Sequence, residues 1–181
     1  MKKFKLLGLV ALLMLSAEAK AESVESRTFP DAHKADRSEY QPHVGVLGGI
    51  VNTNNTSGNT EDYGIDIGYQ PFVPYGLGVE ATFSKTPDTN GQDEDRTSLL
   101  AKGTYNFGGD TAVIKNSYAG VVLGSILRAD NNYLAGGPML GFDIPVTNQG
   151  KLTLGASAKY LFVDGIEPDA TVVNAAVKLW F

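Results

Sequence analysis

Cysteine is absent from the 181 residues of this chain, and histidine occurs only twice. The lack of cysteine excludes disulfides, thiol catalysis and thiolate metal sites, so the chain must be held together by pairing and packing. Long apolar runs are also missing, apart from residues 6–15. That run is about half of the ~20 residues that a membrane-spanning helix needs.

The first 21 residues have the three parts of a secretory signal peptide. Three lysines within the first five residues precede the apolar run 6–15, and small-residue cleavage sites follow at 17–19 or 19–21. This order of charge, apolar run and small residues is typical of an exported chain. No cysteine follows the apolar run, which excludes a lipoprotein anchor. We therefore expect residues 1–21 to be removed on export.

The exported chain would be acidic and of single-domain size. Residues 22–181 contain 11 basic and 19 acidic side chains, a net charge of −8. A chain with this excess of negative charge is not expected to bind nucleic acid. Residues 22–39 mix charges with few apolar residues, so we expect a disordered, polar periplasmic lead-in. The remaining residues, 40–181, would make one domain.

From Tyr40 onward the chain reads as short alternating runs separated by turn residues. In the clearest run, 61–69, tyrosine and isoleucine alternate with aspartate and glycine. Side chains of a strand point alternately to opposite faces, so this pattern predicts strands with one apolar face. Several such runs favour an all-β barrel or sandwich. The eight predicted strands are residues 42–52, 61–69, 76–85, 96–107, 117–128, 133–144, 151–162 and 173–181. Pro138 cannot donate to a ladder, so we expect a bulge or local distortion there.

The last strand has a pattern of its own, with apolar residues at every second position and an aromatic residue at the end. The residues concerned are Val173, Ala175, Val177, Leu179 and Phe181. This strand resembles the assembly signal of bacterial outer-membrane β-barrels, and residues 40–181 resemble the small OmpA/OmpX-type barrels. Residues 118–124 also resemble a strand common in that group.

This resemblance implies a single eight-stranded antiparallel up-and-down transmembrane β-barrel in the outer membrane of a Gram-negative bacterium. Both termini would lie in the periplasm. Expected partners are outer-membrane lipid and lipopolysaccharide, and periplasmic chaperones and the barrel-assembly machinery during biogenesis. A monomer is favoured over an oligomer. A barrel with no peptidoglycan-binding domain and short outer loops would differ from some members of this group.

Alternation alone also fits a soluble, lipocalin-like barrel with the apolar face turned inward. Strand length and aromatic placement favour the membrane. About eleven residues tilted at ~45° span roughly 25 Å, the height of the apolar band of outer-membrane barrels. Threading the strands up and down sorts the aromatic residues into two groups, as expected for girdles at the two membrane interfaces. One group is Tyr69, Tyr105, Phe107, Phe142 and Phe181; the other is Tyr63, Phe83, Tyr160 and Phe162.

The opposite face of the strands carries glycine, serine, threonine and charges. An eight-stranded barrel is just wide enough for its own side chains, so unpaired charge inside would be costly. We therefore predict an interior ion network formed by Asp66, Glu80, Arg96, Lys102, Arg128, Asp143, Lys159 and Lys178. Such a network would plug the barrel. A narrow channel for ions or small solutes is the alternative.

Little in the sequence indicates catalysis or a cofactor. The acidic segment 88–95 lacks the spacing of an EF-hand loop, which makes a solvated loop the better interpretation than a calcium site. His43 falls near the expected periplasmic end, whereas enzymes on this scaffold place their histidine at the outer rim. We expect His43 to be interfacial or hydrogen-bonded inside. The predicted role is structural or surface-interaction, such as membrane integrity or adhesion, and not enzymatic, with no cofactor and no metal.

Overall fold

The computed structural model describes residues 41–54, 58–72, 75–87, 92–107, 114, 116–128, 131–147 and 151–181. The proposed signal peptide and lead-in, residues 1–39, lie outside this part. Within it the chain forms eight strands, β1 (Gln41–Thr53), β2 (Thr60–Phe72), β3 (Tyr75–Pro87), β4 (Asp93–Asn106), β5 (Ser117–Arg128), β6 (Asn131–Pro145), β7 (Leu152–Val163) and β8 (Ala170–Trp180). In these ranges no helix is long and apolar enough to cross a membrane.

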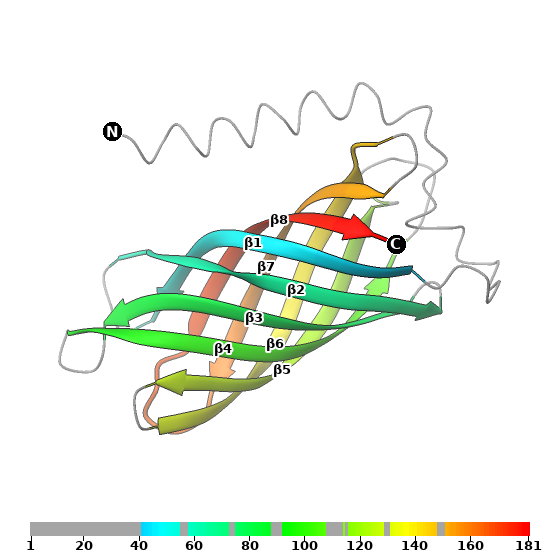
Figure 1. The fold of residues 1–181 in the computed structure, drawn as a ribbon. Helices are drawn as coiled ribbons and strands as arrows, with labels where there is room; N and C mark the ends of the chain where they lie inside the picture. The colour runs from blue at the N-terminus through cyan, green and yellow to red at the C-terminus, as the bar shows by residue number, and fades with distance from the viewer. Residues whose placement is uncertain are drawn as a thin grey trace, which may run out of the picture.

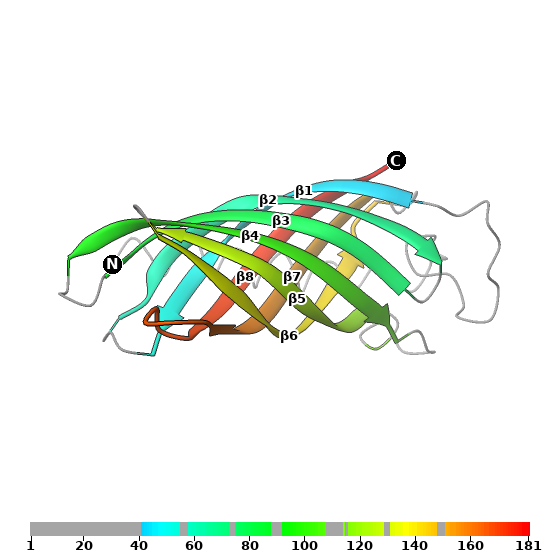
Figure 2. The same ribbon diagram turned by 90° about the horizontal axis from the view of Figure 1, so that it is seen from below.

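The strands close into one antiparallel barrel in sequence order, and β8 pairs with β1. A path along the strand pairs that leaves β1 at His43, and that carries the β6–β7 register across its gap, returns to β1 at Thr53, ten residues further along. Such a stagger tilts the strands by about 40° to the barrel axis. The tilt is visible in Figure 2. Beyond β8, the Phe181 N–H donates to the Pro42 carbonyl at 3.0 Å, so the last residue is fixed against β1.

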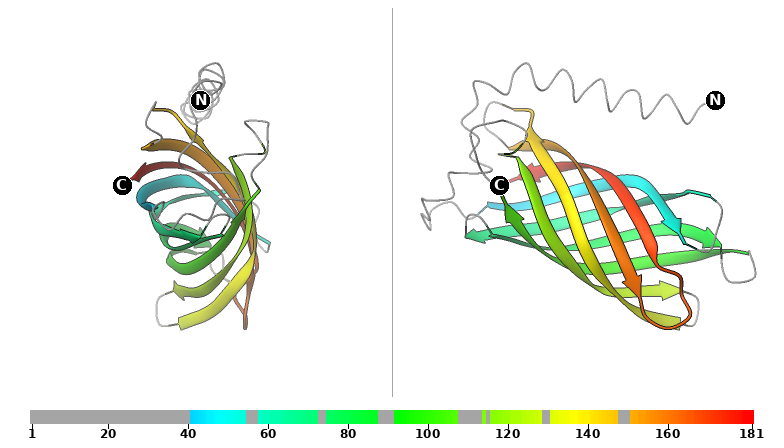
Figure 3. Two further views of the ribbon diagram at one scale, coloured as in Figure 1. Left: turned by 90° about the vertical axis from the view of Figure 1, so that its right-hand side faces the viewer. Right: turned by 180° about the vertical axis from the view of Figure 1, so that it is seen from behind.

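Consecutive connections alternate between the two ends of the barrel. The β1–β2, β3–β4, β5–β6 and β7–β8 connections lie at one end, here called the hairpin end. Phe181 lies at the opposite end, here called the C-terminal end (Figure 1). Figure 3, right, shows the wall formed by β5 to β8, which lies behind β1 to β4 in Figure 1.

The apolar face of the strands points out of the barrel. Tyr63, Ile65, Ile67 and Tyr69 of β2 are 42–56% exposed, and the same holds for alternate residues of the other strands. The soluble-barrel alternative required this face to line the interior, and the structure contradicts it. An outward apolar surface around a closed barrel is the arrangement of membrane-spanning barrels. The predicted fold class is confirmed.

Part of the interior is apolar, which the sequence analysis did not anticipate. A cluster of buried residues on the inward faces of β1 and β4 to β8 packs against itself inside the barrel. Its members are Val51, Leu100, Tyr118, Val122, Ile126, Ala135, Met139, Leu161, Ala170 and Val172. The interior is therefore filled by apolar side chains as well as by charges, and strands β4 to β8 contribute to both sets.

The structure bears on two local predictions, the loop at 86–95 and the distortion at Pro138. The predicted loop 86–95 is shorter, because β3 continues to Pro87 and β4 begins at Asp93. Segment 88–91 lies outside the described residues, and Asp93 to Asp95 alternate faces in a strand instead of forming a loop.

At Pro138 the β6–β7 ladder is interrupted between the Gly136–Phe162 and Met139–Lys159 pairs, and the register is the same on both sides. The distortion is thus a gap in pairing without an inserted residue.

Candidate functional site

The eight charged residues predicted for the interior all lie inside the barrel. Their exposed fractions run from 0% for Asp66 to 9% for Lys102. Alternation explains this placement: each residue is one or three positions from an outward apolar residue of its own strand. The charges form three groups, at the C-terminal end, near the middle, and at the hairpin end.

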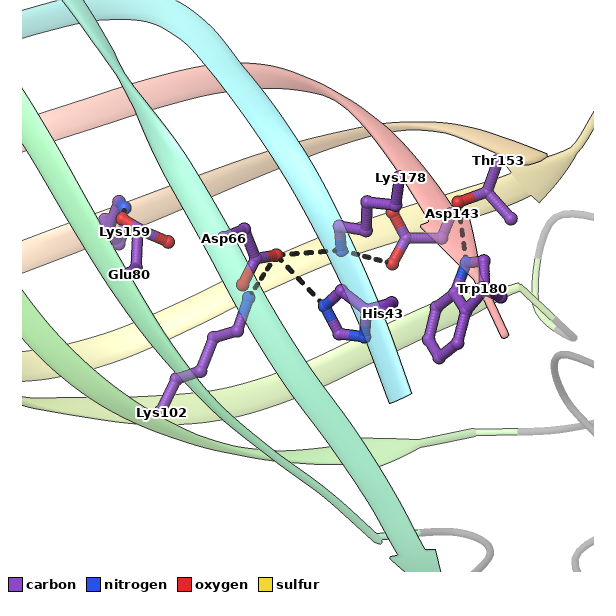
Figure 4. Close-up of polar contacts among 9 residues, drawn as sticks. All are labelled: His43, Asp66, Glu80, Lys102, Asp143, Thr153, Lys159, Lys178 and Trp180. Carbon is purple, nitrogen blue, oxygen red and sulfur yellow. Dashed lines mark hydrogen bonds and ion pairs between the residues drawn. The ribbon is translucent and has the colours of Figure 1, made fainter. Parts of the chain in front are cut away.

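At the C-terminal end, Asp66 of β2 is the centre of a cluster. Its Oδ2 atom lies 2.6 Å from Lys102 Nζ, 3.3 Å from His43 Nε2 and 3.5 Å from Lys178 Nζ. Figure 4 shows these three side chains converging on one carboxylate from β4, β1 and β8. A buried carboxylate needs such compensation, because an uncompensated charge in this setting costs several kcal/mol.

Lys178 connects this carboxylate with a second one. Its Nζ lies 2.6 Å from Asp143 Oδ2 on β6 and 5.5 Å from the centre of the Tyr118 ring. β2 and β6 lie on opposite sides of the barrel, and β8 is two strands from each. Lys178 therefore bridges two carboxylates across the lumen. Gly155 makes room for Asp143, since a methyl group there would collide with its carboxylate.

Two aromatic residues complete this end. The Trp180 indole N–H donates to Thr153 Oγ1 at 3.1 Å, and its ring lies 4.3 Å from the His43 ring, centre to centre. His43 is thus inside the barrel and hydrogen-bonded, one of the two positions expected for it. A cavity of about 30 Å³ lies beside this cluster, lined in part by Lys102, Asp143 and Trp180. That volume holds about one water molecule.

The middle group consists of a single ion pair between opposite walls. Lys159 of β7 contacts Glu80 of β3, and both side chains are almost fully buried (Figure 4). Nearer the hairpin end, the Asn174 side-chain amide donates to Asp62 Oδ2 at 3.1 Å. These contacts tie β3 to β7 and β8 to β2 through the lumen.

The third group closes the hairpin end. Glu167, in the β7–β8 connection, is only 8% exposed; its Oε1 lies 3.1 Å from Arg128 Nε and 3.8 Å from Arg96 Nε. Arg128 also contacts Glu94 at 3.4 Å and donates to Thr86 Oγ1 and the Pro87 carbonyl. The connection joins β7 to β8, and its Glu167 side chain reaches arginines of β4 and β5, so this side chain lies across the hairpin end of the lumen.

Glu167, Asp62 and Trp180 also belong to the interior set, although none was among the residues predicted for it. Asp62 and Trp180 fall at inward positions of their strands, and counting in steps of two from Asp66 or Lys178 would have found them. Glu167 belongs to a connection, where no periodicity applies. Nothing in the sequence signals that this loop turns into the barrel.

The other predicted residues lie on the outward surface. Of the terminal strand, Val173, Val177, Leu179 and Phe181 are 42–66% exposed, while Ala175 is half-buried. Tyr69, Tyr105, Phe107, Phe142 and Phe181 lie toward the C-terminal end, and Tyr63, Phe83, Tyr160 and Phe162 toward the hairpin end. Neighbours in both groups make edge contacts, with ring centres 6.1 Å apart for Tyr105–Phe107 and 4.9 Å for Tyr160–Phe162.

No family model and no curated protein matches the sequence. Solved structures do share the fold. Neisserial surface protein A superposes with a TM-score of 0.62 at 17% identity, over 82% of this chain and all of that one. The attachment invasion locus protein Ail of Yersinia pestis gives 0.50 at 12%, over 78% and 97%. The outer membrane protein OprG of Pseudomonas aeruginosa gives 0.50 at 11%, over 86% and 99%.

These likenesses and the strand order define the class. The chain has the fold of the small eight-stranded outer-membrane β-barrels, as the resemblance of its last strand to an assembly signal implied. At such identities the likeness concerns the fold alone.

Proposed function

We propose that this chain is an exported outer-membrane protein with a structural or surface-interaction role, and not an enzyme. The observation that carries the proposal is the inverted barrel, with apolar side chains on the outside and charges on the inside. In water that outer surface would be a large exposed apolar patch, whereas in a bilayer it is buried by lipid. Lipid and lipopolysaccharide would therefore surround the barrel as its direct partners.

Biogenesis follows from both ends of the chain. Residues 1–21 direct export, and residues 22–39 remain in the periplasm. Periplasmic chaperones hold the unfolded barrel, and the assembly machinery reads the terminal strand with Phe181. The hairpin end then faces the outside and the C-terminal end the periplasm. The protein works as a monomer in this proposal, because sheet closure leaves no strand edge to pair with a second copy.

Two features favour a structural or contact role over transport. Ion pairs and an apolar cluster cross the interior, and this supports an interior filled by its own side chains, as expected for eight strands. The connections at the hairpin end have only two to six residues. Contact with another surface would thus use the strand ends, chiefly those of β3 and β4. These two strands extend further than β5, because they still pair at Lys85–Asp95 and Pro87–Asp93, beyond the last β4–β5 pair (Figure 1). Surface and attachment names among the fold relatives are consistent with such a role.

Gel mobility of the membrane fraction, with and without deletion of Phe181, tests the proposal. A closed membrane barrel stays compact in unheated detergent and shifts on boiling, and loss of Phe181 should reduce the assembled fraction severalfold. Phe162→Ala is a matched control, since Phe162 is also an outward aromatic, 60% exposed, but lies outside the terminal strand. Recovery of the protein as a soluble periplasmic species, with no shift on boiling, would refute the proposal.

A narrow channel is the second candidate, favoured by one observation. Beside the small cavity, His43 Nδ1, Asp66 Oδ1 and Asp143 Oδ1 are buried and make no hydrogen bond within the described part of the chain. Water there would be the start of a wet path from the periplasmic side. Single-molecule conductance in planar bilayers distinguishes the two candidates. Discrete current steps, with an ion selectivity that differs between the wild type and Lys178→Gln, would establish the channel. A barrel that gives no current steps would support the structural role.

A further inference from the structure

The arginine pair at the hairpin end is only partly compensated. Arg96 is 1% exposed, yet its Nε and Nη2 donors make no hydrogen bond among the described residues, and its contact with Glu167 is long, at 3.8 Å. A buried guanidinium normally satisfies its five donors, because leaving them without partners costs free energy. Arg128, 4% exposed, shares the same Glu167 oxygen at 3.1 Å. Glu167 thus contacts both buried guanidinium groups, and Arg128 has Glu94 as a further carboxylate at 3.4 Å.

The carboxylate comes from a segment whose ends are fixed by hydrogen bonds and whose tip is held by its contacts with the two arginines. Asp169 accepts hydrogen bonds from the Val163 N–H and the Tyr160 hydroxyl, and Asp164 donates its N–H to the Leu134 carbonyl. Between them Gly165 has a φ of +80°, a conformation that favours glycine. Glu167 lies at the tip and is held in the described structure by the two arginines.

We propose that Arg96 and Arg128 form a binding site for a small soluble oxyanion, a phosphate or a carboxylate, and that Glu167 occupies this site in the unliganded protein. Two guanidinium forks facing one lumen match the several acceptor oxygens of such an anion. Both arginines lie inside the barrel beneath Glu167, so in this proposal an anion would reach them from the hairpin end only as the Glu167 side chain moves away. Binding would move the Glu167 carboxylate out and satisfy the donors of Arg96 that now have no partner.

Competition from the Glu167 carboxylate determines how much the affinity for an anion should rise when that carboxylate is removed. An apparent dissociation constant is the intrinsic one divided by the fraction of molecules whose site is free. If Glu167 occupies the site in nine molecules of ten, removing its charge should tighten binding about tenfold. Glu61, also at the hairpin end but outside the lumen and exposed, provides a control for the simple loss of one negative charge.

Inorganic phosphate is the probe, titrated into the full-length protein in maltoside micelles, which contain no lipid phosphate. The readout is the NMR signal of the arginine Nε–H groups. We expect Glu167→Gln to bind phosphate about tenfold more tightly than the wild type, Glu61→Gln to bind like the wild type, and Arg96→Lys in the Glu167→Gln background to lose that gain. Gel mobility on boiling verifies that each variant remains a closed barrel.

Three results would overturn the site. Glu167→Gln could bind phosphate no better than Glu61→Gln, or binding could persist undiminished after Arg96→Lys. A response to added lipopolysaccharide in the absence of any response to inorganic phosphate would assign the arginines to lipid instead. Should Arg96→Lys fail to fold, Arg128→Lys in the same background applies the same criterion. The proposed structural role is independent of all these outcomes, since it is decided by membrane assembly.

Discussion

At the scale of single residues, Lys178 is a buried cation that lies between two buried carboxylates. It is 4% exposed and lies 2.6 Å from Asp143 and 3.5 Å from Asp66. Asp66 keeps Lys102 as a second cationic partner, but no second cation contacts Asp143 within 4 Å in the described part of the chain. Removing Lys178 would therefore leave one carboxylate buried without an ion pair.

We expect Lys178→Met to lower the free energy of unfolding by about 3 kcal/mol or more, the usual cost of removing one partner of a buried pair. Urea titration of the barrel in lipid vesicles measures it. Lys85→Met is the control, because its pair with Asp95 is 73% and 86% exposed. That variant should stay within about 0.5 kcal/mol of the wild type. Adding Asp143→Leu to Lys178→Met should restore part of the loss. Equal effects of the Lys178 and Lys85 variants would contradict the buried pair.

At the scale of elements, close approach between strands and side chains decides where glycine is needed. On β2, a methyl group at Gly68 would collide with the imidazole of His43 on the paired strand β1. On β1, a methyl group at Gly48 would project into open space outside the barrel. The two glycines look alike in sequence and differ only in the face they belong to.

Gly68→Ala should accordingly cost about 1–3 kcal/mol through overpacking, and displace His43 from Asp66. Gly48→Ala should be neutral, or stabilising by up to about 1 kcal/mol because alanine loses less entropy in a strand. Urea titration gives the free energies. Fluorescence reports the displacement, since Trp180, the only tryptophan in the chain, lies against the His43 ring. An unchanged spectrum in Gly68→Ala would mean that the imidazole does not occupy this place.

The elements also show what the sequence could reveal. Strict alternation in 61–69 and 173–181 was enough to predict β2, β8 and which of their residues share a face. That the apolar face points outward was predicted from strand length and aromatic placement instead. In β5, Val121, Val122 and Leu123 are consecutive, so alternation assigns no polar face there, and Val122 belongs to the interior apolar cluster. Ion-pair partners depend on the stagger between strands, which no single strand contains. This is why the interior charges could be named from the sequence while the pairs Lys159–Glu80 and Lys178–Asp143 could not.

At the scale of the whole molecule, the cost of placing a charge on the outward surface should depend on its depth in the membrane. Leu123, near the centre of β5, is 60% exposed, whereas Thr97 lies on the same face close to the hairpin end, where it pairs with Phe83. A charge costs most at the bilayer midplane and little at the interface.

Leu123→Arg should therefore destabilise the barrel by about 2–4 kcal/mol in lipid vesicles, and Thr97→Arg by at most about 1 kcal/mol. Urea titration of both variants measures the difference. The same pair of variants in detergent micelles, whose depth is less sharply defined, should differ less. If the two substitutions cost the same in vesicles, the apolar band does not coincide with the hydrocarbon layer.

The bridges across the lumen also bear on how the barrel comes together. Lys178 of the last strand meets Asp66 of the second strand and Asp143 of the sixth, and Lys159 meets Glu80 on the opposite wall. None of these partners lies on an adjacent strand, so an open sheet of any length leaves the charges facing water. Neutralisation is deferred to the final step, when β8 reaches β1. A partly built barrel would gain nothing by trapping its charges in lipid, and this favours a single concerted closure over a series of stable, half-inserted intermediates.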